Sequence, residues 1–98
     1  MITFVNVFTV KPEQQQAALE AIAQVYREAV KLQPGFISAK LLKSNDGTRV
    51  TAIALWETEA DLKAMRTTQK FKDLHDPSFS EKIVSVDSHV YDSVIEIE

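Results

Sequence analysis

The chain has 98 residues, of which 45% are hydrophobic and 26% are charged, and its formal net charge is −3. This length and composition predict one globular domain over residues 1–98. No basic cluster offers a surface for nucleic acid or for an anionic membrane, so neither is an expected partner. The absence of cysteine excludes disulfides, thiolate catalysis and metal sites built on sulfur.

The first ten residues, MITFVNVFTV, lack the basic start and the small-residue cleavage site of a signal peptide. We therefore expect a cytoplasmic protein without a membrane span. Residues 2–10 are rich in β-branched and aromatic residues, which predicts a strand. Phe4, Asn6 and Phe8 share one side of this strand.

A helix of about five turns is expected to follow from Pro12, because a missing N–H costs little in the first turn. Its apolar residues recur at helical spacing: Ala18, Ile22, Val25, Tyr26, Ala29 and Leu32. Pro34 and Gly35 end it. Two strands, 36–42 and 49–56, then form a hairpin around an Asp-Gly turn at residues 44–48.

Thr58 and Asp61 resemble a capping box, which predicts the start of a second helix. The polar segment 67–70 is expected to divide this helix, and Asp76-Pro77 is expected to close its second piece. The apolar residues of the two pieces are Leu62, Met65, Phe71 and Leu74.

Residues 83–98 have the pattern of a long strand, with an irregularity expected near Asp87-Ser88. The order of elements is therefore βαββαβ. It predicts an α+β, ferredoxin-like fold with a four-stranded antiparallel sheet and both helices on one face.

Two helices cover only one face of such a sheet, yet large apolar residues lie on both faces. Strand 49–56 has Trp56 on one side and Ile53 and Leu55 on the other. Leaving several hundred Å² of apolar surface in water would lose on the order of 10 kcal/mol at about 25 cal/mol per Å². A small domain lacks that margin. We therefore predict a homodimer that forms through the open sheet faces.

Several short motifs, taken in their order and spacing, resemble the antibiotic biosynthesis monooxygenase (ABM) family of the dimeric α+β barrel superfamily. They are Lys-Pro after the first strand, PGF at 34–36, IALWETEADLKAM at 53–65 and FKDLH at 71–75. The resemblance covers nearly the whole chain and implies a dimeric α+β barrel. The superfamily contains cofactor-free quinone-forming monooxygenases, haem-degrading monooxygenases, isomerases and members of unknown role, so the fold does not decide the reaction.

The resemblance to the haem-degrading branch is partial. That branch has an Asn in the first strand, a Trp in the second helical region and a His ligand four residues after a Phe. Asn6, Phe71 and His75 match this pattern, and His75 follows Trp56 by the same interval of 19 residues. Met65 stands where that branch has the Trp whose ring helps to force the haem out of plane.

The quinone-forming branch matches at Trp56, whereas Ala52 and Leu62 stand where its Asn and Tyr would fall. In cofactor-free members, the deprotonated substrate itself supplies electrons to dioxygen. The resemblance then implies that the protein contributes a dry pocket, a base and stabilisation of an oxyanion.

His75 is the candidate catalytic base and Asn6 the candidate oxyanion stabiliser. Each also has a structural interpretation. An imidazole near a helix C-terminus interacts favourably with the helix dipole, and a buried amide needs a hydrogen-bond partner. The candidate substrate-binding residues are Trp56, Met65, Phe71 and Tyr26, of which Trp56 and Met65 also suit a core. His89 matches no motif.

We therefore expect a monooxygenase that acts on a small, flat, mainly apolar phenol or quinol without a metal or flavin. One alternative is a haem-binding or haem-degrading enzyme with His75 as the iron ligand. The other is a non-catalytic homodimer that binds such a ligand, which the departures from the family patterns at positions 52, 62 and 65 favour.

Overall fold

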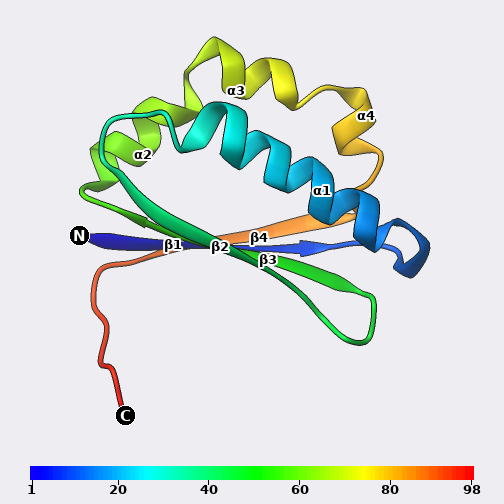
Figure 1. Cartoon of the computed structure of the whole chain (residues 1–98), viewed down its shortest axis with the longest axis horizontal. Helices are drawn as coiled ribbons and strands as arrows, with labels where there is room; N and C mark the ends of the chain where they lie inside the picture. Colours follow the sequence, from blue (N-terminus) through cyan, green and yellow to red (C-terminus); the bar gives the residue numbers. More distant parts are fainter.

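The computed structural model describes all of residues 1–98. Four strands form one antiparallel sheet in the order β2-β3-β1-β4, and the helices cover one face of it (Figure 1). The strands are β1 (Ile2–Thr9), β2 (Phe36–Lys43), β3 (Arg49–Trp56) and β4 (Ser85–Tyr91). The predicted ferredoxin-like α+β fold is confirmed. None of the helices has the length and apolar character needed to cross a membrane.

The two central strands, β1 and β3, carry the core of the sheet. Phe4 and Phe8 of β1 face the helices and are buried. Their partners on β3, Ala54 and Val50, are also buried. Ala52 of β3, which pairs with Asn6 of β1, is small and fully buried. Large and small side chains therefore alternate along the helix-facing side of the sheet.

The first helical region is less regular than the sequence pattern predicts. It consists of a 3-10 turn, η1 (Pro12–Gln14), then α1 (Gln15–Val25), and then a π-helical segment, η2 (Tyr26–Val30). Five apolar residues of α1 and η2 are buried: Ala18, Ile22, Val25, Ala29 and Val30. Leu32, predicted on the same face, is 69% exposed because the helix ends before it.

Two glycines with positive φ form tight turns that other residues would strain. Gly35, with φ of 85°, precedes β2, and Gly47, with φ of 83°, lies in the turn between β2 and β3. In the second turn the Asp46 carboxylate accepts hydrogen bonds from the backbone N–H and hydroxyl of Thr48 and from the Ser44 hydroxyl. These bonds, the Thr48 backbone bond first, lower the pKa of Asp46 to about 2. The predicted turn at 44–48 is confirmed.

Helix α2 (Glu59–Arg66) begins at the predicted cap. Thr58 Oγ1 accepts a hydrogen bond from the Asp61 backbone N–H at 3.1 Å. The same hydroxyl donates to the Asp61 carboxylate at 2.8 Å. The Asp61 side chain thus reaches the capping hydroxyl, whereas in a standard capping box it would reach the backbone N–H of the cap residue.

The predicted break in the second helical region is also confirmed. Helix α3 (Gln69–Leu74) begins after Thr68, whose hydroxyl caps it. Asp76 does more than close this helix. Its Oδ1 accepts a hydrogen bond from the Phe79 backbone N–H at 2.9 Å and so starts a further turn, α4 (Pro77–Ser80), which was not predicted.

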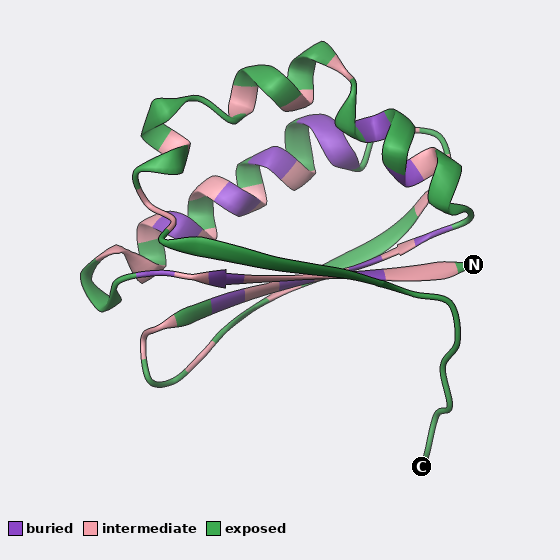
Figure 2. Ribbon diagram, turned by 180° about the vertical axis from the view of Figure 1, so that it is seen from behind, coloured by how far each residue is buried: buried purple, intermediate pink, exposed green.

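The C-terminal strand is shorter than the pattern at 83–98 predicts. β4 is exposed along its length (Figure 2) and pairs with β1 in unbroken register, so the irregularity expected near Asp87-Ser88 is wrong. Both polar residues are accommodated in a regular strand, because they lie on opposite faces and each has a partner. The irregularity of this sheet lies between Phe36 and Ser38 of β2. Residues 92–98 leave the sheet without regular structure (Figure 1).

The sheet face turned away from the helices has an apolar centre. Val5 and Val7 of β1 and Ile53 and Leu55 of β3 project from this face, and each is partly exposed. No helix covers it (Figure 1). The sheet therefore has apolar residues on both faces, as predicted. The helices cover one face, and the other, called the open face, is exposed to solvent.

Candidate active site

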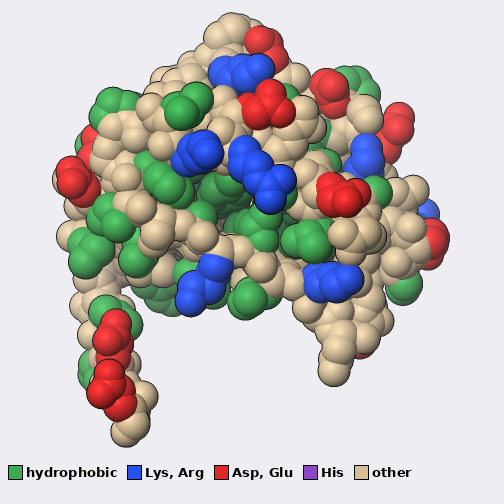
Figure 3. Space-filling view, viewed as in Figure 1, with side chains coloured by type: hydrophobic (Ala, Val, Ile, Leu, Met, Phe, Trp, Pro, Cys, Tyr) green, Lys and Arg blue, Asp and Glu red, His purple; other side chains and the backbone are tan.

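A cavity of about 400 Å³ lies between the sheet and the helices. Ten of its fourteen lining residues are hydrophobic, and the other four are Asn6, Arg66, His75 and Ser88. Figure 3 shows hydrophobic side chains gathered in the hollow between the helices and the sheet, with Lys and Arg side chains beside it. Mostly apolar walls with a few polar groups are typical of a site for a small organic molecule.

The floor of this cavity is a row of short side chains that crosses three strands. Ser88, Asn6 and Ala52 are aligned on β4, β1 and β3. The rows on either side of it contain the large rings of Phe4 and Phe8. The alternation of large and small residues along the sheet therefore leaves space above Asn6.

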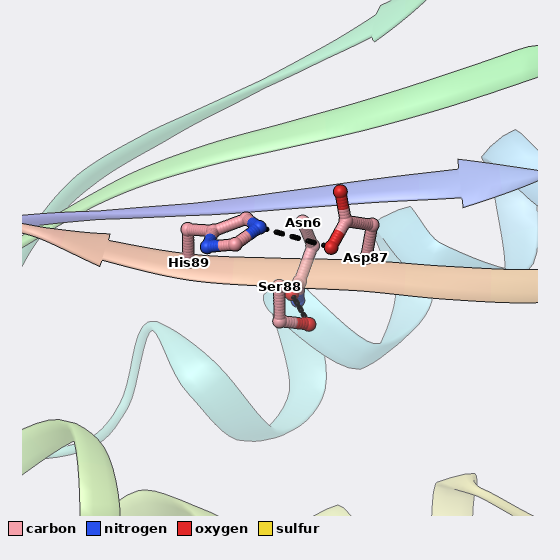
Figure 4. Close-up of polar contacts among 4 residues, drawn as sticks. All are labelled: Asn6, Asp87, Ser88 and His89. Carbon is pink, nitrogen blue, oxygen red and sulfur yellow. Dashed lines mark hydrogen bonds and ion pairs between the residues drawn. The ribbon is translucent and has the colours of Figure 1, made fainter.

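Asn6 is held by a hydrogen bond across the β1–β4 pair. The Ser88 hydroxyl donates to the Asn6 carboxamide oxygen. Figure 4 shows this pair pointing toward the helices, while His89 and Asp87 lie on the other face of the strand. Asn6 Nδ2 has no hydrogen-bond acceptor within the chain. The expected structural hydrogen bond of Asn6 thus accounts for its oxygen and leaves its N–H groups for a ligand.

His75 both caps helix α3 and lines the cavity. Its Nδ1 lies 2.7 Å from the carbonyl oxygen of Phe71. A carbonyl oxygen only accepts, so Nδ1 carries a proton, and the tautomer that fits this contact has its lone pair on Nε2. The ring lies between the rings of Phe71 and Phe79, at centroid distances of 4.2 and 4.5 Å. These contacts fix its orientation.

Tyr26 lines the same cavity from the start of the π-helical segment. Burial raises the pKa of Tyr26 to about 12, against the opposing effect of the Arg66 charge. The phenol therefore stays protonated near neutral pH and is a hydrogen-bond donor, not a base.

The predicted site residues separate into two groups. Asn6, His75, Met65, Phe71 and Tyr26 all line the cavity. Trp56 does not, because it is fully buried in the core, where it packs edge-on against Phe36 at a centroid distance of 5.5 Å. This placement agrees with its core interpretation.

Two polar lining residues were not identified from the sequence, Arg66 and Ser88. The guanidinium carbon of Arg66 lies 4.6 Å from the centroid of the Phe4 ring. A signal for Ser88 does exist in the sequence, because Val86, Ser88 and Val90 alternate on one side of a strand. The register of β4 against β1 is needed to place Ser88 beside Asn6.

A family model described as antibiotic biosynthesis monooxygenase matches residues 1–77 of the chain. The tetracenomycin-F1 monooxygenase of Streptomyces glaucescens is 38% identical over 72 residues, which are 74% of this chain. The matched part spans 64% of the length of that enzyme.

Solved structures have the same fold at low sequence identity. SnoaB of Streptomyces nogalater, described as a cofactor-independent oxygenase, matches with a TM-score of 0.73 and 21% identity, over 98% of this chain and 95% of its own. A candidate antibiotic biosynthesis monooxygenase from Nitrosomonas europaea matches with a TM-score of 0.80 and 20% identity, over 97% of this chain and 100% of its own.

Proposed function

The chain belongs to the antibiotic biosynthesis monooxygenase family, and within it we propose a monooxygenase that oxidises a small, flat, mainly apolar phenol or quinol without a metal or flavin. The observation that carries this proposal is that Asn6 and His75, which lie 69 residues apart in sequence (75 − 6), line one apolar cavity. The similarity to the tetracenomycin-F1 enzyme and to SnoaB supports it.

In the proposed reaction, His75 Nε2 removes the proton of a substrate phenol, and Asn6 Nδ2 donates a hydrogen bond to the resulting phenolate oxygen. The phenolate then supplies electrons to dioxygen. A phenol with a hydrogen on its para carbon and one O₂ give a quinone and one water. One oxygen atom becomes the new carbonyl and the other leaves as water, so no further reductant is needed.

We also propose that two copies pack through the open sheet face and that the protein acts as a homodimer. Val5, Val7, Ile53 and Leu55 give this face its apolar centre. The cavity lies on the opposite side of the sheet, so each copy would keep its own site. Burying such a face removes apolar area from water, which is the main favourable term in association.

Oxygen uptake with a panel of anthrones and hydroquinones tests the proposed reaction. With a substrate of the wild type, His75→Ala should lower kcat by about 10²-fold or more, and Asn6→Ala by about 10²-fold. His89→Gln is the matched control, because His89 lies on the other face of the sheet (Figure 4), and it should leave kcat unchanged. Uptake no faster than in buffer across the panel would favour the non-catalytic ligand-binding homodimer.

Haem binding is a second candidate, favoured by the hydrogen bond of His75. Axial histidine ligands typically donate one ring N–H to an acceptor and bind the metal through the other nitrogen. The 2.7 Å contact of Nδ1 with the Phe71 carbonyl gives His75 this arrangement, and Nε2 would hold the iron. Bound haem would supply activation of dioxygen. Met65, in place of the Trp of haem-degrading relatives, lines the same cavity.

Titration with haemin distinguishes this candidate from the first. A shifted Soret band that is lost in His75→Ala and kept in His89→Gln would support haem ligation by His75. The spectrum of free haemin, unchanged by the protein, would reject it and leave the cofactor-free reaction standing.

A further inference from the structure

We infer that Arg66 binds an anionic group of the substrate, so that the substrate class is a flat aromatic molecule carrying a carboxylate or a comparable acidic group. This inference rests on the proposed function, because it takes the cavity above Asn6 as the substrate site.

The first observation is the charge of the cavity wall. No Asp or Glu is among the fourteen lining residues. Arg66 is the lining residue that carries a charge at every accessible pH. Tyr26 does not balance this charge, since its phenol is neutral near physiological pH. The cavity wall therefore carries a positive charge, which a neutral ligand would leave unpaired.

The second observation is that Arg66 lacks a partner while its basic neighbours have one. Lys63, three residues before it, forms an ion pair with Glu59 at 3.5 Å. Lys70, four residues after it, forms an ion pair with Glu28 at 3.4 Å. Arg66 has no ion pair and donates no hydrogen bond within the chain. Its charge is available to a ligand.

The third observation is the position of the guanidinium. It lies over the ring of Phe4, which is itself part of the cavity wall, with 4.6 Å between the guanidinium carbon and the ring centroid. This cation–π contact uses none of the guanidinium N–H groups as hydrogen-bond donors, and these N–H groups match a carboxylate in fork geometry. Ring systems would thus bind against the apolar wall, with the anion at Arg66.

A pair of fluorescent ligands of nearly equal shape tests this directly: anthracene carboxylate and its neutral hydroxymethyl analogue. The wild type should bind the carboxylate about tenfold more tightly, the factor expected for one charge-assisted contact of an exposed Arg66. Arg66→Gln should remove this preference and leave the Kd of the neutral analogue within about twofold. Arg66→Lys keeps the positive charge but lacks the paired N–H groups of the guanidinium, so it should retain part of the preference for the carboxylate.

Arg27→Gln is the control, because it removes the same charge from an exposed residue that does not line this cavity. It should keep the full preference. Raising the salt concentration should weaken binding of the carboxylate to the wild type and not to Arg66→Gln.

Equal affinity of the wild type for the two ligands would overturn the inference and leave the proposed function intact. An equal loss of affinity for both ligands in Arg66→Gln would also overturn the inference, because it would mean that Arg66 contributes packing and not charge. If neither ligand bound, both the inference and the proposed aromatic site would fail, whereas oxygen uptake tests the chemistry separately.

Discussion

Asn6 is open to the cavity because its neighbours across the sheet are short, and one of these neighbours carries a hydroxyl. Ala52 on one side leaves space, and Ser88 on the other donates to the carboxamide oxygen. This bond fixes which end of the amide is available, since the oxygen is occupied and Nδ2 is not. We therefore expect Ser88 to position the Asn6 amide in the proposed reaction.

Replacing Ser88 by Ala should lower kcat by about tenfold, because the amide can then rotate and present its oxygen to a phenolate. KM should change less than kcat, since the apolar walls remain. Steady-state oxygen uptake measures both constants. Ser88→Thr, which keeps the hydroxyl, should restore most of the rate.

Ser85→Ala is the control for this substitution, because Ser85 is on the same strand and pairs with Thr9, away from the cavity floor. If Ser88→Ala and Ser85→Ala had the same small effect, the hydrogen bond to Asn6 would have no part in positioning.

Predictability from sequence differs between residues of this one site. His75 was predicted from a fixed spacing, four residues after Phe71, and Asn6 from its place between Phe4 and Phe8 in the first strand; both line the cavity. Arg66 and Ser88 match no motif, and their places in the cavity wall depend on the rotation of α2 and on the register of β4. Trp56 stands in a motif and is nevertheless a core residue, because large rings are often retained for packing.

At the scale of elements, alternating and helical patterns predicted the order of strands and helices, because the central strands and the helices bury an apolar face. What the patterns missed depends on tertiary contacts. The first helical region ends as a π-helical segment, and π-turns are often found at functional sites. Here that segment begins with Tyr26, which lines the cavity.

The turn at Gly35 offers a test of how tightly β2 and α2 are joined. A Cβ at Gly35 would overlap the Asp61 side chain, and its φ of 85° already disfavours any other residue. Gly35→Ala should therefore reduce the free energy of unfolding by roughly 2–3 kcal/mol. Urea denaturation measures this change.

Gly47→Ala is the matched comparison, because its φ of 83° is similar but the nearest atom to an added Cβ, in Pro12, is 3.2 Å away. Its loss should be smaller, roughly 1–2 kcal/mol. Equal losses at the two positions would mean that backbone conformation alone, and not the contact with Asp61, limits Gly35.

The same hairpin turn makes a small acid-sensitive contribution to stability through Asp46. Its folded pKa of about 2 lies below its usual value of 3.8, because the Thr48 and Ser44 groups stabilise the carboxylate. A depressed folded pKa stabilises the native state above the unfolded pKa, and this contribution is lost as the pH falls from about 4 to about 2.

Asp46→Asn should accordingly lower Tm slightly at pH 7 and flatten the decline of Tm between pH 4 and pH 2, as measured by thermal melts followed by circular dichroism. Asp73→Asn, which removes an exposed carboxylate elsewhere, is the control. An unchanged acid decline in Asp46→Asn would show that the turn hydrogen bonds do not persist in solution.

At the scale of the whole molecule, the fold places the apolar cavity and the open apolar sheet face on opposite sides of one sheet. Phe4, Asn6 and Phe8 of β1 face the helices and the cavity, and the alternate residues Val5 and Val7 face outward. A strand that is apolar on both sides needs cover on both sides. The helices of the chain cover one side of the sheet. The outward face is therefore the expected site of self-association.

A charge placed at the centre of that face should therefore separate the copies while leaving the cavity intact. Ile53 lies opposite Val5 on the open face, so Ile53→Lys would bury an unpaired ammonium in a dimer but expose it in a monomer. We expect light scattering to give twice the chain mass of 11.0 kDa for the wild type and a single chain mass for Ile53→Lys. Leu32→Lys, at a residue that is already 69% exposed beside the helices, should remain dimeric. A wild-type particle of 11.0 kDa at working concentration would contradict the proposed dimer, and the outward face would then need another partner.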